Sequence, residues 1–187
     1  MKGKRGRATT ALIILDLISE FRFQHAERLL PVAKRIAAPV ARLKARAKAA
    51  GLPVIYVNDT AGKWESDQGS FVSRCLADDA RGREIVKRVI PDVDEYFIFK
   101  PRHSGFYATP FQELLERLAV KELILVGLTT HQCVLFTAVD AHVREFKLIV
   151  PSDCVGAFSS EESRHALFIL RRSIKARTPK STSLVLR

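Results

Sequence analysis

Three side chains of different chemical types stand where apolar, strand-like runs of this 187-residue chain come to an end. Asp16 closes the first run, Lys100 closes the third, and Cys133 lies in the turn that starts the helix after the fourth. Ligands of open α/β sheets gather beyond the carboxyl ends of the strands, so we expect these three residues to meet at one edge. Taken singly, each has an ordinary structural interpretation as a loop acceptor, an exposed lysine or a small core residue.

An acid, a cation and a thiol are together what covalent acyl transfer by a cysteine requires. The thiolate is the attacking species, and both the N–H groups of a helix start and the ammonium of Lys100 favour that anion. Asp16 can accept the thiol proton and return it later to a leaving nitrogen. Backbone N–H groups in the turn over residues 129–133 can hold the developing oxyanion. The residues therefore predict a nucleophilic Cys133 whose thiol is ionised.

The elements that must position these residues alternate between strand and helix. We expect strands over 11–17, 53–58, 95–99, 123–126, 147–150 and 183–186, and helices over 26–50, 71–89 (in pieces), 110–118, 131–145 and 160–176. This alternation indicates right-handed βαβ units and a parallel sheet. The predicted fold class is α/β: a three-layer α/β/α sandwich, Rossmann-like, with a mainly parallel sheet of about six strands. We expect residues 1–10 to form a flexible basic tail and residues 11–187 a single domain.

Motifs at three of these strand ends occur together in one order. They are Leu15-Asp16-Leu17 with Phe21, Lys100 with Ser104-Gly105-Phe106 and Thr109, and Val126-Gly127-Leu128-Thr129-Thr130-His131-Gln132-Cys133-Val134 with Thr137-Ala138. In this combination the chain resembles the isochorismatase-like cysteine hydrolase superfamily, from about residue 11 to residue 155. One such motif is weak, whereas three in the right order and at the right strand ends are specific.

The resemblance implies roles for individual residues. It implies a triad in which Cys133 is the nucleophile, Asp16 the general acid/base, and Lys100 the cation that lowers the pKa of the thiol. It also implies an oxyanion hole formed by the backbone N–H groups of Thr129 and Cys133, and a non-proline cis peptide bond at Leu128–Thr129.

The segment Asn58–Asp67, after the second strand, contains no histidine. The nicotinamidase branch of the superfamily carries an Asp and several His there as metal ligands, and carboxylates alone make a poor transition-metal site. We therefore expect no metal, no cofactor and no nicotinamidase activity. The Asn-Asp…Gly-Lys-Trp pattern of this segment resembles the ureidoacrylate-type amidohydrolases instead. His131 is a further departure, because the superfamily often has Asp or Asn there.

Four aromatic residues near these motifs are candidate walls of a substrate pocket, with ordinary packing as the alternative: Phe21, Trp64, Phe106 and Tyr107. The remaining cysteines lack a CxxC partner and are expected to fill the core: Cys75 and Cys154. Two histidines are expected to be surface or capping residues: His103 and His165.

The composition limits the class of partner. Lys and Arg number 31 and Asp and Glu 20, for a net charge of +11. No RNA-binding, helix-turn-helix or zinc-finger motif accompanies this charge, which argues against nucleic acid and is compatible with an anionic small-molecule substrate.

No apolar run approaches the ~18 residues of a membrane span, so we expect no membrane partner. Asp16 interrupts the first apolar run too early for a secretory signal, and three cysteines suit a reducing compartment, so we expect a cytoplasmic protein. Relatives in the superfamily form dimers and tetramers, and we expect a homo-oligomer of one of these kinds.

The leading functional hypothesis is a hydrolase that cleaves a small non-peptide amide, carbamoyl or ureido C–N bond through a thioester on Cys133. The cysteine favours this hypothesis, because several isochorismatases, which cleave a vinyl ether, lack it. An isochorismatase-type vinyl-ether hydrolase is the alternative enzyme. A basic binding protein without catalysis is the third possibility.

Overall fold

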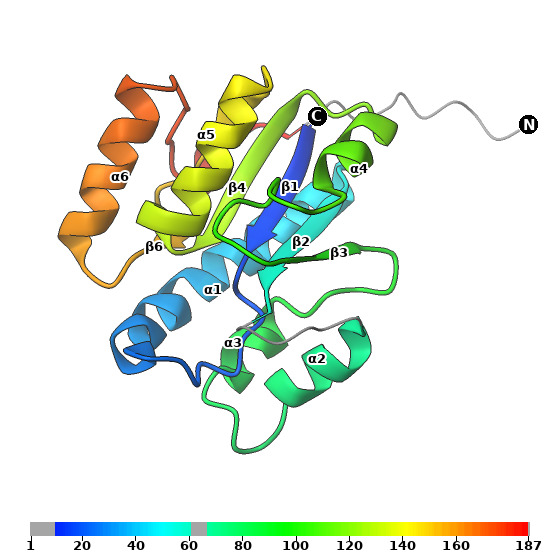
Figure 1. Ribbon diagram of the computed structural model, residues 1–187, viewed down its shortest axis with the longest axis vertical. Coiled ribbons are helices and arrows are strands. Elements are labelled where there is room, and N and C mark those ends of the chain that lie inside the picture. The colour runs from blue at the N-terminus through cyan, green and yellow to red at the C-terminus, as the bar shows by residue number, and fades with distance from the viewer. Residues whose placement is uncertain (1–9, 61–66, 187) are drawn as a thin grey trace, which may run out of the picture.

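A computed structural model describes residues 10–60 and 67–186, and its centre is a six-stranded parallel sheet (Figure 1). The strands are β1 (Thr10–Leu15), β2 (Val54–Asp59), β3 (Tyr96–Lys100), β4 (Glu122–Leu128), β5 (Lys147–Ile149) and β6 (Val155–Gly156). Their order is β3-β2-β1-β4-β5, and β6 pairs with β4 beyond the end of β5. Because every pair is parallel, all the strands end at the same edge of the sheet.

Helices cover both faces of the sheet. They are α1 (Ala26–Ala49), α2 (Gln68–Cys75), α3 (Arg83–Arg88), α4 (Phe111–Arg117), α5 (Leu135–Val143) and α6 (Ser160–Arg172). Two of these helices begin at side-chain caps: the Asp67 carboxylate accepts from N–H groups in the first turn of α2, and Ser159 forms a capping box with Glu162 at α6. A π-helical turn, Thr130–Val134, connects β4 to α5. In the described parts of the chain, no helix has the length and apolarity needed to cross a membrane.

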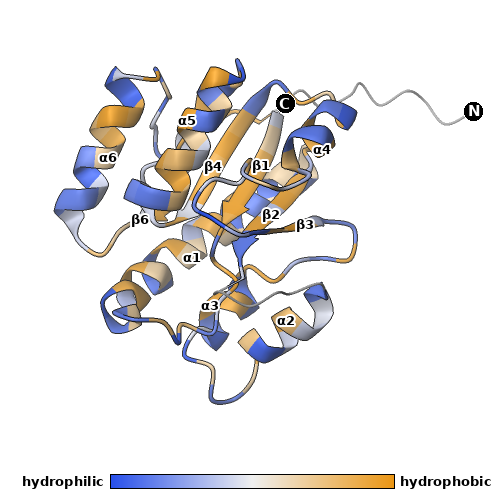
Figure 2. Ribbon diagram, in the orientation of Figure 1, coloured by the Kyte–Doolittle hydropathy of each residue, from blue (hydrophilic) through white to orange (hydrophobic). Residues whose placement is uncertain are grey.

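The alternating side chains of β1 divide the core into two layers. Leu12 and Ile14 pack with α1, α2 and α3, whereas Ala11, Ile13 and Leu15 pack with α4, α5 and α6. All five are fully buried, as expected for a central parallel strand covered on both faces. The helices carry hydrophobic and hydrophilic stripes in turn (Figure 2), so each turns one face to the sheet and the other to solvent. The predicted three-layer α/β/α sandwich with a parallel sheet of about six strands is confirmed.

One predicted strand is wrong. The chain over 183–186 pairs with no strand of the described sheet, and a short 3-10 helix, Ser181–Ser183, precedes its end. The carbonyl groups of Ser181 and Leu184 accept hydrogen bonds from the Arg46 guanidinium, so a side chain of α1 takes the place of a neighbouring strand. The sixth strand is Val155–Gly156, which is too short for its sequence to show any periodicity. Residues 1–9 of the expected basic tail lie outside the described residues.

Candidate active site

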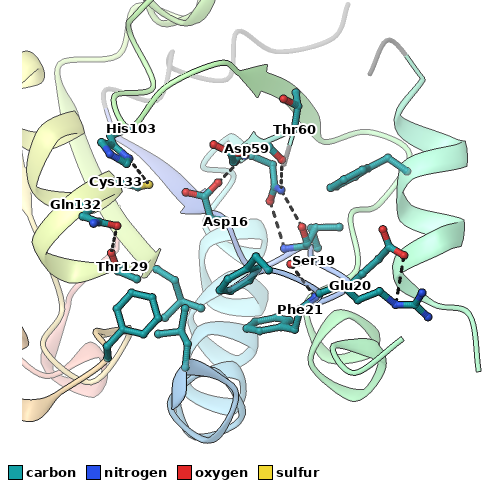
Figure 3. A pocket seen from close by; sticks show the side chains of 18 of the residues that line it. Asp16, Ser19, Glu20, Phe21, Asp59, Thr60, His103, Thr129, Gln132 and Cys133 are labelled. Atoms are coloured by element: carbon teal, nitrogen blue, oxygen red, sulfur yellow. Dashed lines mark hydrogen bonds and ion pairs between the residues drawn. The ribbon is translucent and has the colours of Figure 1, made fainter. Parts of the chain in front are cut away.

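A cavity of about 620 Å³ opens where the strands end (Figure 3). Its walls come from the segment after β1, the end of β2, α2, the loop after β3 and the segment that joins β4 to α5. The described lining residues are Asp16, Ile18, Ser19, Glu20, Phe21, Arg22, Phe23, Leu29, Asn58, Asp59, Thr60, Phe71, Arg74, His103, Leu128, Thr129, Gln132, Cys133 and Phe158. The cavity is of a size that suits a small molecule.

Asp16 directly follows β1 and has a left-handed backbone conformation, with φ of 53°. Its backbone N–H donates to the carbonyl of Val57 at 3.3 Å, which extends the pairing of β1 with β2 by one residue. Its Oδ1 accepts the backbone N–H of Asp59 at 2.6 Å. The ends of two adjacent strands therefore fix the carboxylate, and only 15% of its side chain is exposed.

Lys100 is the last residue of β3, and its side chain is completely buried. Its Nζ lies 3.0 Å from Oδ2 of Asp16 and donates to Sγ of Cys133 at 3.4 Å and to the carbonyl of Arg102 at 3.2 Å. Burial by itself lowers the pKa of Lys100, but the neighbouring acidic groups, Asp16 first, outweigh it and raise this pKa above its usual value. Lys100 is therefore a buried cation at neutral pH.

Cys133 lies within the π-helical turn, a feature that occurs often at functional sites. Burial raises the pKa of its thiol, the charge of Asp16 raises it further, and Lys100 only partly offsets the two. The net pKa is well above that of a free cysteine. The sequence-based expectation of an ionised thiol is therefore wrong for the resting site, although the predicted direction of the Lys100 effect is right.

The segment between β4 and the π-helical turn sets the direction of the backbone beside Cys133. Gly127 has φ of 113°, and a Cβ there would clash with the backbone of Leu15 in β1, so only glycine fits this close approach. The Leu128–Thr129 peptide bond is cis. The carbonyl of Thr129 accepts the N–H groups of Gln132 and Val134, each at 3.2 Å, which ties this segment to the turn that holds Cys133.

The aromatic residues expected in the pocket separate into three groups. Phe21 lines the cavity. Phe106 and Tyr107 are not among its described lining residues: Phe106 packs on Phe111 at a ring distance of 4.8 Å, and Tyr107 is 59% exposed. Both follow Gly105, whose backbone N–H donates to the hydroxyl of Thr137 on α5. Trp64 lies outside the described residues.

Some lining residues were not expected from the sequence. His103 is one of them, since its Nδ1 lies 3.8 Å from Sγ of Cys133. On another wall Glu20 pairs with Arg22 at 3.9 Å and with Arg74 at 3.7 Å. The only indication in the sequence was position, because Glu20 and Arg22 follow β1 and His103 follows β3. Among the described residues, no group of three His, Cys, Asp or Glu side chains could hold a metal ion.

Comparisons with known proteins agree with this architecture. A family model described as an isochorismatase domain matches residues 10–178. The isochorismatase family protein YaaI of Bacillus subtilis is 35% identical over 170 residues, which cover 91% of this chain and 93% of that protein. The ureidoacrylate amidohydrolase RutB of Methylorubrum extorquens is 28% identical over 177 residues, with 78% of this chain and 68% of that protein covered.

Among solved structures, the N-carbamoylsarcosine amidase of Thermoplasma acidophilum superposes with a TM-score of 0.73. It is 26% identical in sequence, and the match covers 94% of this chain and 98% of that chain. The family match spans every strand of the described sheet and all three residues that meet at its edge. The chain therefore belongs to the isochorismatase family of hydrolases.

Proposed function

We propose that the protein hydrolyses a small non-peptide amide, carbamoyl or ureido C–N bond through a thioester on Cys133. Cys133 is the nucleophile, Asp16 the general acid/base and Lys100 the cation that pairs with the negative charge of the site. One observation carries the proposal: a fully buried ammonium lies 3.0 Å from a carboxylate and 3.4 Å from a thiol, at the floor of a cavity. A carboxylate, an ammonium and a sulfhydryl are the groups that a thiol-based acyl transfer needs.

The resting charges favour an internal proton transfer. The site holds one anion, Asp16, one cation, Lys100, and a neutral thiol, since the pKa of Cys133 is raised. When the thiol proton moves to Asp16, the anion becomes the thiolate and the net charge stays the same. Because no additional charge is buried, the transfer avoids the desolvation penalty that opposes ionisation of Cys133 to bulk water.

Acylation follows from that transfer. The Cys133 sulfur attacks the carbonyl carbon of the substrate, and the C–S bond forms as the carbonyl oxygen takes up negative charge. The backbone N–H groups of Thr129 and Cys133 are the donors for this oxyanion, and one such donor contributes about 3 kcal/mol to transition-state stabilisation. Asp16 then gives its proton to the leaving nitrogen, and the C–N bond breaks.

The class of substrate is supported by the cavity and by the relatives. A cavity of about 620 Å³ is of the size that takes a small metabolite. Two relatives are named for compounds with C–N bonds of this kind, a ureidoacrylate amidohydrolase and an N-carbamoylsarcosine amidase. Arg22 and Arg74 on the wall both pair with Glu20, and Arg22 pairs with Asp79 as well, so an acidic substrate would have to compete with these carboxylates for the two cations.

The test is a panel of primary amides, ureido acids and N-carbamoyl amino acids, with ammonia release as the readout. Wild type and Cys154→Ala, whose cysteine is buried outside the cavity, are expected to turn over at least one compound equally. Cys133→Ser and Asp16→Asn are each expected to lose about 10³-fold or more. Turnover of an added vinyl-ether acid, read as release of the keto acid, that Cys133→Ala keeps and Asp16→Asn loses would instead support vinyl-ether chemistry. If wild type turns over none of the panel, the proposed substrate class is wrong.

A further inference from the structure

The Cys133 sulfur has polar neighbours on two different sides (Figure 3). Asp16 and Lys100 form one side, at the closed floor of the cavity, where their side chains are 15% and 0% exposed. His103 forms the other side: its Nδ1 lies 3.8 Å from Sγ, and the residue is exposed. The imidazole also packs against the ring of Phe136 on α5, at a centroid distance of 5.6 Å.

The backbone on both sides of His103 is held in place. The carbonyl of Arg102 accepts a hydrogen bond from Nζ of Lys100 at 3.2 Å, which ties this residue to the site itself. The hydroxyl of Ser104 donates to the carboxylate of Asp140 on α5. An exposed histidine between two anchored residues is positioned ahead of the reaction, as a catalytic group must be.

We propose that His103 is a further catalytic residue, the general base that activates water for hydrolysis of the Cys133 thioester. This inference rests on the proposed function, because it requires an acyl group on the sulfur. Water reaches the thioester from the open cavity, which is the side where His103 lies. Asp16 also lines the cavity, but its Oδ1 accepts the Asp59 N–H and its Oδ2 pairs with Lys100, whereas the His103 ring stands on the exposed side of the sulfur.

The proposed step balances in atoms and charge. The water oxygen forms a bond to the acyl carbon while the water proton moves to a ring nitrogen of His103. The C–S bond then breaks, its electron pair returns to Sγ of Cys133, and the proton passes from the imidazole to that sulfur. The products are a free acid and the neutral thiol of the resting site. Because Nδ1 already lies within reach of Sγ, the return of the proton needs no large movement.

The experiment separates acylation from deacylation, with p-nitrophenyl acetate as the probe. Acylation releases one p-nitrophenolate per site as a burst, and deacylation sets the later steady rate. His103→Ala is expected to keep the burst and to lose about 10²-fold in the steady rate, the usual contribution of one general base. Added imidazole is expected to restore part of that rate. His103→Asn, which keeps a polar group at the same point but no base, is expected to be as slow as His103→Ala, and His165→Asn on α6 is the matched control.

Each result decides the matter. A steady rate in His103→Ala equal to wild type overturns the proposal, as does loss of its burst, which would place the histidine in acylation. If His103→Ala has a slow steady rate that imidazole does not restore, while His103→Asn has the wild-type rate, His103 makes a positioning contact and is not the base. If wild type shows no burst and no acetyl group on Cys133, the proposed function itself fails and this inference falls with it.

Discussion

Replacement of Lys100 by methionine tests how the proposed triad holds its charge. Methionine fills nearly the same volume without a charge. The lysine cation lies 3.0 Å from the Asp16 carboxylate and 3.4 Å from the Cys133 sulfur. At an effective dielectric constant near 20, its attraction to an anion at either position is about 5 kcal/mol. The two attractions differ by less than about 1 kcal/mol, so Lys100 hardly influences which of the two groups carries the proton.

The lysine instead keeps one negative charge in the site. Without it, that charge is unpaired in a mostly buried place, and uptake of a proton from solvent removes it. Loss of about 5 kcal/mol corresponds to a fall of about 5 × 10³-fold in acylation at neutral pH. Because the missing anion can be regenerated by raising the pH, the rate in Lys100→Met is expected to rise about tenfold per pH unit, whereas the wild-type rate does not.

The assay is the burst rate with p-nitrophenyl acetate between pH 6 and pH 9. Thermal unfolding of each variant verifies that it is folded, and Lys87→Met on the exposed face of α3 is the matched control. A Lys100→Met burst rate equal to wild type at pH 7 would refute the reasoning. A lost rate that stays flat with pH would also refute it, because it would show a structural defect and not a missing charge.

Three further predictions concern stability and are checked by chemical denaturation. Burial, followed by the charge of Asp153, raises the pKa of Cys154 to about 12. Above pH ~8.5 the folded thiol therefore keeps its proton while the unfolded one loses it. The unfolding free energy of wild type should then fall, relative to that of Cys154→Ala, by about 1.4 kcal/mol per pH unit. Parallel plots of unfolding free energy against pH for the two proteins would contradict this. Glu95→Gln removes the buried partner of Lys44, 2.8 Å away, and should cost about 3 kcal/mol, whereas a change below 1 kcal/mol would show that the pair contributes little. Gly127→Ala should lower the unfolding free energy by more than about 3 kcal/mol, because its Cβ clashes with Leu15 and its φ is positive. Gly51→Ala, whose Cβ meets open space, should lower it by about 1 kcal/mol. Equal losses in the two variants would argue against the close approach at Gly127.

The sequence predicted the parts of the fold that depend on long apolar runs. The continuous apolar character of β1 and the position of Asp16 at its end follow from a strand buried on both faces, and the structure has both. The run over 183–186 was misread because apolar character does not reveal what a backbone pairs with. Here the carbonyl of Ser181 accepts a hydrogen bond from Arg46, and its N–H donates to the Asp153 carboxylate.

The site was predictable only where a residue stands at a strand end. Lys100 ends β3, so its position followed from the topology of a parallel sheet. His103 depends on the path of a loop, which is set by the contact of Ser104 with Asp140 and could not be read from a single histidine. The pKa of Cys133 results from opposing effects of burial, a carboxylate and an ammonium, and the sequence does not give their relative size.

The most direct test of the thioester is rapid acid quenching of the enzyme within the first turnover of p-nitrophenyl acetate, followed by peptide mass spectrometry. We predict one acetyl group, on the peptide that contains Cys133, in wild type and in His103→Ala, where it persists longer. We predict none at this position in Cys133→Ser. Turnover at the wild-type rate with no acetyl group on Cys133 at any time would contradict the account.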